Sequence, residues 1–125
     1  MKRKDLIFKV IKRKRALNLT IEQIANLTGL GYRTVARFLS GEDVKLSTVE
    51  KITNLLGLDF AGNEIINIEE LLEKRAKQKA LYIVSLVQDT SSLEEQGLNK
   101  EDLNKLLEFT KNKFLTENKK LLWVN

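Results

Sequence analysis

Apolar residues recur along this chain at intervals of three and four, which places them on one face of an α-helix. The pattern is clearest in two stretches. Residues 20–41 contain two short runs of this kind on either side of Gly29, and residues 68–88 contain one long run. Strand-like alternation of apolar and polar residues is absent, and so is proline. The pattern therefore predicts an all-α fold.

Capping residues predict where the helices of the first half begin and end. Thr20, followed three positions later by glutamine, can form a capping box, in which each side chain bonds the other residue's amide. Gly29 suits the left-handed conformation in which many helices end. Ser47, three positions before Glu50, predicts a second capping box. Helices are expected over residues 5–17, 20–28, 32–40 and 47–56, after a disordered basic arm over residues 1–4.

The second half of the chain contains a long helical pattern and a shorter one. Asn67 can cap a helix over residues 68–88, and Asn99 can cap a last helix over residues 100–117. Because asparagine side chains accept hydrogen bonds from first-turn amides, both positions suit a helix start. We therefore expect a long helix and then a C-terminal helix.

A loop separates the two halves. Residues 59–67 contain one glycine and two asparagines, which favour a connection over a helix. The sequence therefore predicts a compact domain of four to five helices over residues 1–60. Residues 61–125 form a helical extension that is expected to serve dimerisation or partner binding.

The positive charge of the chain gathers beside residues 20–41. The whole chain has a net charge of +5, with 22 basic and 17 acidic residues. Residues 1–20 carry eight basic side chains against Asp5 alone, whereas residues 61–125 carry 10 basic and 11 acidic ones. A basic cluster attracts a polyanion. Such clusters also occur on helix surfaces that only face water. This cluster indicates nucleic-acid binding only if a binding motif lies beside it.

The residue types exclude several classes of function. The chain has no histidine and no cysteine, which excludes disulfide bonds and zinc sites of the usual kind. Without a histidine base, a cysteine nucleophile or a glycine-rich phosphate loop, neither an enzyme nor a cofactor is expected. The N-terminus lacks the apolar run of a signal peptide, and no window approaches the about 20 apolar residues of a membrane helix. A cytoplasmic protein without membrane contact is expected.

Residues 20–41 resemble the helix-turn-helix of the phage repressor and Cro superfamily of DNA-binding proteins. The match rests on Ala25, Gly29 and Val35, at positions five, nine and fifteen of that motif. The flanking segments also match, so the resemblance covers roughly residues 5–60. The family often has glutamine at the first position, where it touches a phosphate, and this chain has isoleucine there.

The resemblance implies which side chains touch DNA. The second helix of such a motif enters the major groove with its first residues toward the base edges. By position, the residues expected to contact bases are Tyr32, Arg33 and Arg37. One threonine matches a position near the DNA backbone, another begins a helix whose amides can bind a phosphate, and three basic residues are further candidates. The predicted phosphate contacts are Thr20, Thr34, Lys45, Arg13 and Arg15.

Two functions follow from this resemblance. The first is sequence-specific binding of double-stranded DNA by a dimeric bacterial or phage repressor that occupies an operator. The alternative is an antitoxin, whose C-terminal helices bind a toxin protein while its N-terminal domain regulates its own operon. Operator half-sites one helical turn apart are bound by a two-fold symmetric dimer. The apolar face of the long helix is therefore either part of the chain's own core or the interface of a homodimer. The residues predicted for this dimer or partner interface are Leu72, Ala76, Ala80, Ile83, Val87 and Trp123.

Overall fold

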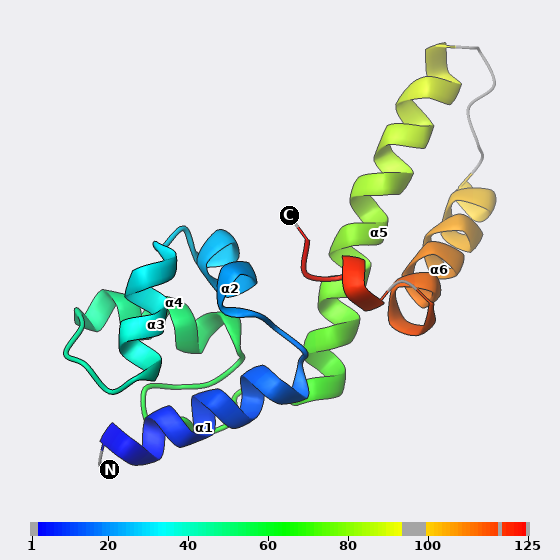
Figure 1. Ribbon diagram of the computed structural model, residues 1–125. Coiled ribbons are helices and arrows are strands. Elements are labelled where there is room, and N and C mark those ends of the chain that lie inside the picture. Colours follow the sequence, from blue (N-terminus) through cyan, green and yellow to red (C-terminus); the bar gives the residue numbers. More distant parts are fainter. Residues whose placement is uncertain (1–2, 94–99, 118, 125) are drawn as a thin grey trace. The chain divides into compact units, whose positions relative to one another are not determined.

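The protein is all-α, as the apolar pattern predicts. A computed structural model describes residues 3–93, 100–117 and 119–124 (Figure 1). A compact bundle of four helices is followed by a long helix and a C-terminal helix. The helices are α1 (Arg3–Ala16), α2 (Ile21–Thr28), α3 (Tyr32–Leu39), α4 (Leu46–Leu55), α5 (Ile68–Leu93) and α6 (Lys100–Thr116), and a short 3-10 helix spans Lys119–Leu121. No helix in the described ranges has the length and apolar character needed to cross a membrane.

Local signals account for the helix-turn-helix geometry. The Thr20 hydroxyl accepts from the Gln23 amide at 3.1 Å, and the Gln23 side chain accepts from the Thr20 amide at 3.0 Å, so the predicted capping box is confirmed. Gly29 ends α2 with a φ of +75°, the left-handed conformation that glycine adopts without steric cost. Asn67 also caps as predicted, because its side-chain oxygen accepts from the Glu70 amide at 2.8 Å.

Two predicted helix starts are wrong. Helix α4 begins at Leu46, with Lys45 at the N-cap and no side-chain hydrogen bond there, so the capping box at Ser47 does not form. Helix α1 begins at Arg3 and not at Asp5, and the Arg3 side chain bonds the turn that follows α3. The predicted cap at residue 99 lies outside the described residues.

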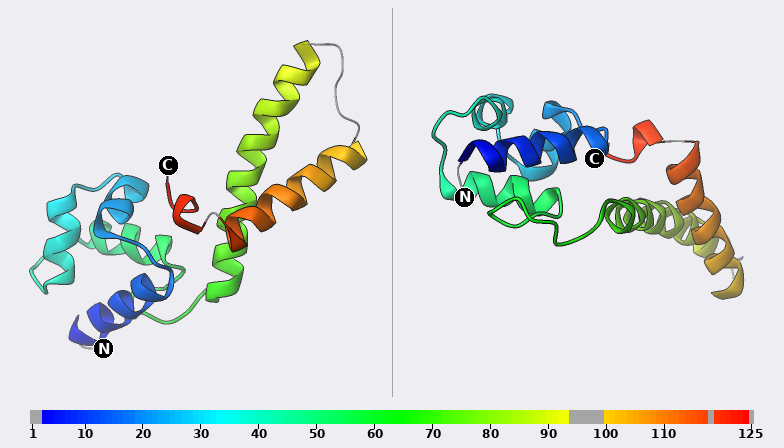
Figure 2. Two further views of the ribbon diagram at one scale, coloured as in Figure 1. Left: turned by 45° about the vertical axis from the view of Figure 1, so that its right-hand side comes forward. Right: turned by 90° about the horizontal axis from the view of Figure 1, so that it is seen from below.

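The first compact unit includes the described residues up to Leu71 and therefore contains the first residues of α5. Its core is formed by α1 to α4, which pack around one another (Figures 1 and 2). The chain after α4 then folds back on the bundle, because the amides of Ile65 and Ile66 donate to the Gly57 carbonyl at 2.8 and 3.1 Å. Among the described residues of this unit, those with at most 1% exposure are Val10, Ile24, Val35, Phe38, Ile52, Leu56 and Thr53.

The second compact unit, residues 72–124, contains most of α5, then α6 and the C-terminal tail. Helices α5 and α6 run in opposite directions (Figure 1), and Lys111 of α6 pairs with Glu73 of α5 at 3.1 Å. The tail lies against α5, where the Arg75 Nε donates to the Leu122 carbonyl at 2.8 Å and the guanidinium stands 5.7 Å from the Trp123 ring. Burial lowers the pKa of Arg75 at this contact. The extension is thus a helical hairpin closed by its own tail.

Candidate nucleic-acid interface

Helix α3 presents a basic surface because its apolar residues face inward. Val35 and Phe38 are 0% and 1% exposed, which fixes the rotation of the helix. Arg33 and Arg37 lie four residues apart, so they share a face, and that face points to solvent. Tyr32, in the first turn of the helix, is 58% exposed. All three predicted base-contact residues are therefore exposed; Arg33 and Arg37 share one face of α3, and Tyr32 lies in its first turn.

A polar groove lies along one flank of α3. It has a volume of about 660 Å³ and runs between α3 and the start of α4. Two predicted phosphate-contact residues, Thr34 and Lys45, line it together with Arg37. Three cationic side chains, several hydroxyl groups and one carboxylate border this concave surface, and its polar lining is Thr34, Arg37, Asp43, Lys45, Ser47, Thr48 and Lys51.

The sequence reasoning missed part of this groove. Ser47 was expected to cap α4, and Lys51 was assigned no role, yet both line the groove. Thr48 is only 5% exposed, and its side chain makes no hydrogen bond to any described residue. The Thr48 amide donates to the Lys45 carbonyl at 3.0 Å, so the donors that the start of α4 can offer an anion are the amides before it. Only the packing of α4 against α3 reveals this arrangement.

The start of α2 offers a smaller site. The Thr20 hydroxyl is already used by the Gln23 amide. What remains for a phosphate are the first backbone amides of α2, whose partial positive charge favours an anion. Thr20 itself is exposed, so this helix end is accessible.

The two arginines near the end of α1 lie in different surroundings. Arg13 is 7% exposed, pairs with Glu64 at 3.1 Å and donates to the Ile66 carbonyl at 3.0 Å. It therefore holds the segment after α4 against α1 and presents almost no surface to a phosphate. Arg15 is exposed and remains available for one.

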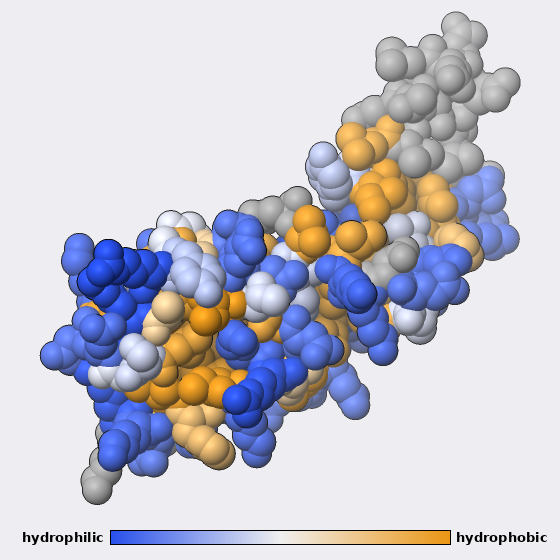
Figure 3. All heavy atoms as spheres, in the orientation of Figure 1, coloured by the Kyte–Doolittle hydropathy of each residue, from blue (hydrophilic) through white to orange (hydrophobic). Residues whose placement is uncertain are grey.

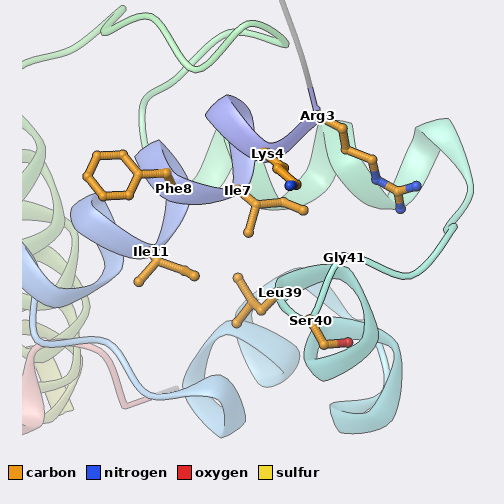
Figure 4. A pocket seen from close by; sticks show the side chains of 8 residues that line it. All are labelled: Arg3, Lys4, Ile7, Phe8, Ile11, Leu39, Ser40 and Gly41. Atoms are coloured by element: carbon orange, nitrogen blue, oxygen red, sulfur yellow. The ribbon is translucent and has the colours of Figure 1, made fainter.

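A second groove, of about 490 Å³, lies on the other flank of α3, where its end meets α1. Figure 4 shows Ile7 and Ile11 of α1 pointing toward Leu39 across it, with Lys4 at the rim. Figure 3 shows apolar surface over the same region of the first unit. Because its floor is apolar, this groove does not suit a phosphate backbone.

The residues predicted for a dimer or partner interface separate into two groups. Ala76 and Ala80 are 0% exposed and Trp123 is 4% exposed, so the chain's own atoms cover them. Leu72 is half-buried, whereas Ile83 is 37% exposed. Val87 lies outside the residues whose side chains are described. Further exposed apolar side chains on α5, which the sequence reasoning left out of the interface, are Leu81, Tyr82 and Leu86.

Comparison with known proteins identifies the first unit. Residues 11–63 match a family model described as helix-turn-helix. Neither the curated proteins nor the solved structures include a match to the chain. In the described part of the chain, no group of three or more acidic, histidine or cysteine residues is placed to hold a metal ion. Residues 11–63 are therefore a DNA-binding helix-turn-helix domain of the phage repressor and Cro type, and the C-terminal part belongs to no family identified by these comparisons.

Proposed function

We propose that this protein is a sequence-specific transcriptional repressor that binds its operator as a dimer. The observation that carries the proposal is the surface of α3, where Arg33 and Arg37 stand exposed next to the polar groove. An arginine fork can donate two hydrogen bonds to O6 and N7 of guanine, which gives about 1–3 kcal/mol of discrimination against other bases. Tyr32 at the start of α3 would meet a thymine methyl or a phosphate.

Phosphate contacts on both sides of α3 would set its depth and orientation in the major groove. On one side are Thr34 and the groove at the start of α4, with Lys45 and Lys51. On the other is the start of α2 at Thr20. Arg15 would add a more distant contact, whereas the buried Arg13 has no place in the proposed set.

The dimer would form through the exposed apolar part of α5. Ile83, from the predicted interface, has exposed apolar neighbours in Leu81, Tyr82 and Leu86. Apolar surface of this kind favours burial against a partner. A two-fold pair would present two copies of α3 to half-sites about one helical turn of DNA apart. Repression would follow from occupying the operator.

A toxin protein is the second candidate for the same α5 surface. The observation that favours it is that the extension lies outside the matched helix-turn-helix segment and still exposes apolar side chains. In that case the chain would be an antitoxin that regulates its own operon. The two functions are not exclusive. Analytical ultracentrifugation of the purified protein tests the first, because the proposed homodimer forms without any partner.

The test is selection from a random duplex library at controlled salt. The wild type should enrich a pseudo-palindrome, and Arg33→Ala/Arg37→Ala should lose this preference by far more than it loses non-specific affinity, because base contacts and phosphate contacts separate in this way. Lys74→Ala/Lys77→Ala is the matched control, since it removes two exposed positive charges from α5 and should keep the preference. If the wild type enriches no sequence at moderate salt, the proposal is wrong.

A further inference from the structure

The turn after α3 carries two acidic residues directly beside the basic surface of the helix. Gly41 has a φ of +92°, which allows the chain to reverse there. The Glu42 amide then donates to the Arg37 carbonyl at 3.0 Å. The backbone of Glu42 is therefore held against the same residue whose side chain is expected to read a base.

The carboxylate of Glu42 faces Arg37. Its Oε2 lies 4.0 Å from the Arg37 Nε and 3.4 Å from the Ser40 hydroxyl. The same hydroxyl lies 3.0 Å from the Arg37 carbonyl, so its one proton is donated either to that carbonyl or to the Glu42 carboxylate. Both charged side chains stay accessible, with 50% and 61% of their surfaces exposed.

The second acidic residue is occupied elsewhere. Asp43 pairs with Arg3 of α1, and the same guanidinium donates to the Glu42 carbonyl. Arg3 thus holds the turn to the bundle through both residues. Among the described residues, this leaves the Glu42 carboxylate as the acidic group paired with Arg37.

We infer that Glu42 is a positioning residue, which orients the Arg37 guanidinium toward one guanine of the operator. The inference rests on the proposed function and deepens it. An arginine has five N–H donors in a planar fork. When the Nε side faces a carboxylate, the two terminal nitrogens are directed away from it and can donate to guanine O6 and N7. Orientation before binding reduces the conformational entropy that Arg37 loses on the DNA.

This role predicts that loss of the Glu42 carboxylate raises non-specific affinity and lowers base preference. Glu42 follows α3 directly, so in the proposed complex its negative charge would lie near the DNA and would lower affinity for every sequence. Removing the charge should raise non-specific affinity. Removing the contact that orients Arg37 should at the same time lower the preference for guanine at one position of each half-site.

The experiment compares Glu42→Gln with the wild type on three duplexes. These are the selected operator, the operator changed at the guanine whose preference Arg37→Ala removes, and an unrelated sequence. Fluorescence anisotropy at several salt concentrations gives each affinity. We expect Glu42→Gln to lower the guanine preference roughly threefold or more. This is a part of the base discrimination that an arginine–guanine pair supplies. Binding of the unrelated duplex should become tighter.

Two further variants separate charge from geometry. Glu50→Gln removes an exposed carboxylate on α4 that forms no ion pair with any described residue, and it should leave the guanine preference unchanged. Glu42→Asp keeps the charge on a shorter side chain. It should lower the guanine preference without tightening non-specific binding.

Four results overturn the inference. If Glu42→Gln tightens binding of the operator and of the guanine-changed operator equally, the carboxylate only repels DNA. If it weakens both and lowers the melting temperature, Glu42 only stabilises the turn. If the wild type selects an operator in which Arg37→Ala changes no base preference, the inference fails while the proposed function stands. A wild type that selects no sequence removes both.

Discussion

At the scale of single residues, burial decides what a basic side chain does. Arg13 and Arg15 stand two positions apart in the same helix, and local sequence does not distinguish them. Arg13 is turned into the bundle, where it satisfies the Ile66 carbonyl and pairs with Glu64. Arg15 is turned to solvent. The first arginine therefore stabilises the fold, and the second is exposed, as the proposed phosphate contact requires.

Replacing these two arginines should have different consequences. Arg13→Ala should lower the free energy of unfolding by about 1.5–3 kcal/mol, because it removes charge-assisted hydrogen bonds from a buried position. Arg15→Ala is the matched control and should change it by at most about 0.5 kcal/mol. Urea denaturation followed by circular dichroism measures both. Equal unfolding midpoints for the two variants would show that Arg13 contributes no more than a surface charge.

Asp59 gives the loop after α4 a dependence on pH. Its Oδ1 accepts from the amides of Asn63 and Ala61 at 2.8 and 2.9 Å, and these hydrogen bonds lower the pKa of the carboxyl below its ordinary value. The unfolded chain therefore binds a proton at higher pH than the folded one does. Below about pH 4 the free energy of unfolding should fall as Asp59 takes up its proton.

The variant that isolates this effect is Asp59→Asn, which keeps a side-chain oxygen and removes the charge. Chemical denaturation at a series of pH values should show a shallower loss of stability on acidification for the variant than for the wild type. Parallel curves would mean that Asp59 adds nothing to the acid sensitivity of the fold.

At the scale of elements, the two glycines of the turn between α2 and α3 differ in whether their backbone conformation requires glycine. Gly29 has a φ of +75°, and no heavy atom lies within 4 Å of the position that a Cβ would take. A substitution there is strained by the backbone alone. Gly31 has a φ of −71°, which any residue adopts, and its added Cβ would meet only the Thr34 hydroxyl at 3.8 Å.

Alanine should therefore be tolerated at one glycine and not at the other. Gly29→Ala should lower the free energy of unfolding by about 1–2 kcal/mol, the cost of a left-handed non-glycine residue. Gly31→Ala should lie within about 0.5 kcal/mol of the wild type, because lost N-cap preference offsets reduced freedom of the unfolded chain. Thermal unfolding of both variants checks the order, and a more costly Gly31→Ala would contradict it.

At the scale of the whole molecule, the extension buries part of the apolar face of α5 against its own residues. The tail and α6 belong to the same unit as α5, and Ala76 and Ala80 have no exposed surface. The proposed interface on α5 would therefore use apolar side chains farther along the helix, where Tyr82 is 65% exposed. The proposed dimer and the closed hairpin are compatible because they use different residues.

Polar substitutions in that exposed part should separate the dimer. Tyr82→Ser/Ile83→Ser should yield a monomer in sedimentation equilibrium, because it removes apolar area that the proposed dimer buries. Binding to the full operator should then weaken, while binding to a single half-site stays unchanged. Ile65→Ser, at a 65% exposed apolar residue of the first unit, is the control and should remain dimeric. A dimeric double variant would place the interface elsewhere.

The helix-turn-helix could be predicted from the sequence because its determinants are local. A capping box closes over four residues, a left-handed glycine ends a helix, and an apolar repeat sets which face turns inward. Those signals place α2 and α3 and turn Arg33 and Arg37 outward. The bond from Asn67 to the start of α5 is equally local and was equally predictable.

Tertiary structure alone decided the features that join distant residues. The partners of Arg13 lie about fifty positions away, and those of Arg75 lie in the C-terminal tail. Ser47 has the spacing of a cap, yet the packing of α4 places it in the groove beside α3. Residue spacing reports which side chains share a face of one helix, but it contains no information about which neighbour covers that face. The sequence therefore determined the recognition motif, and the packing of the helices decided which charges and apolar residues remain exposed.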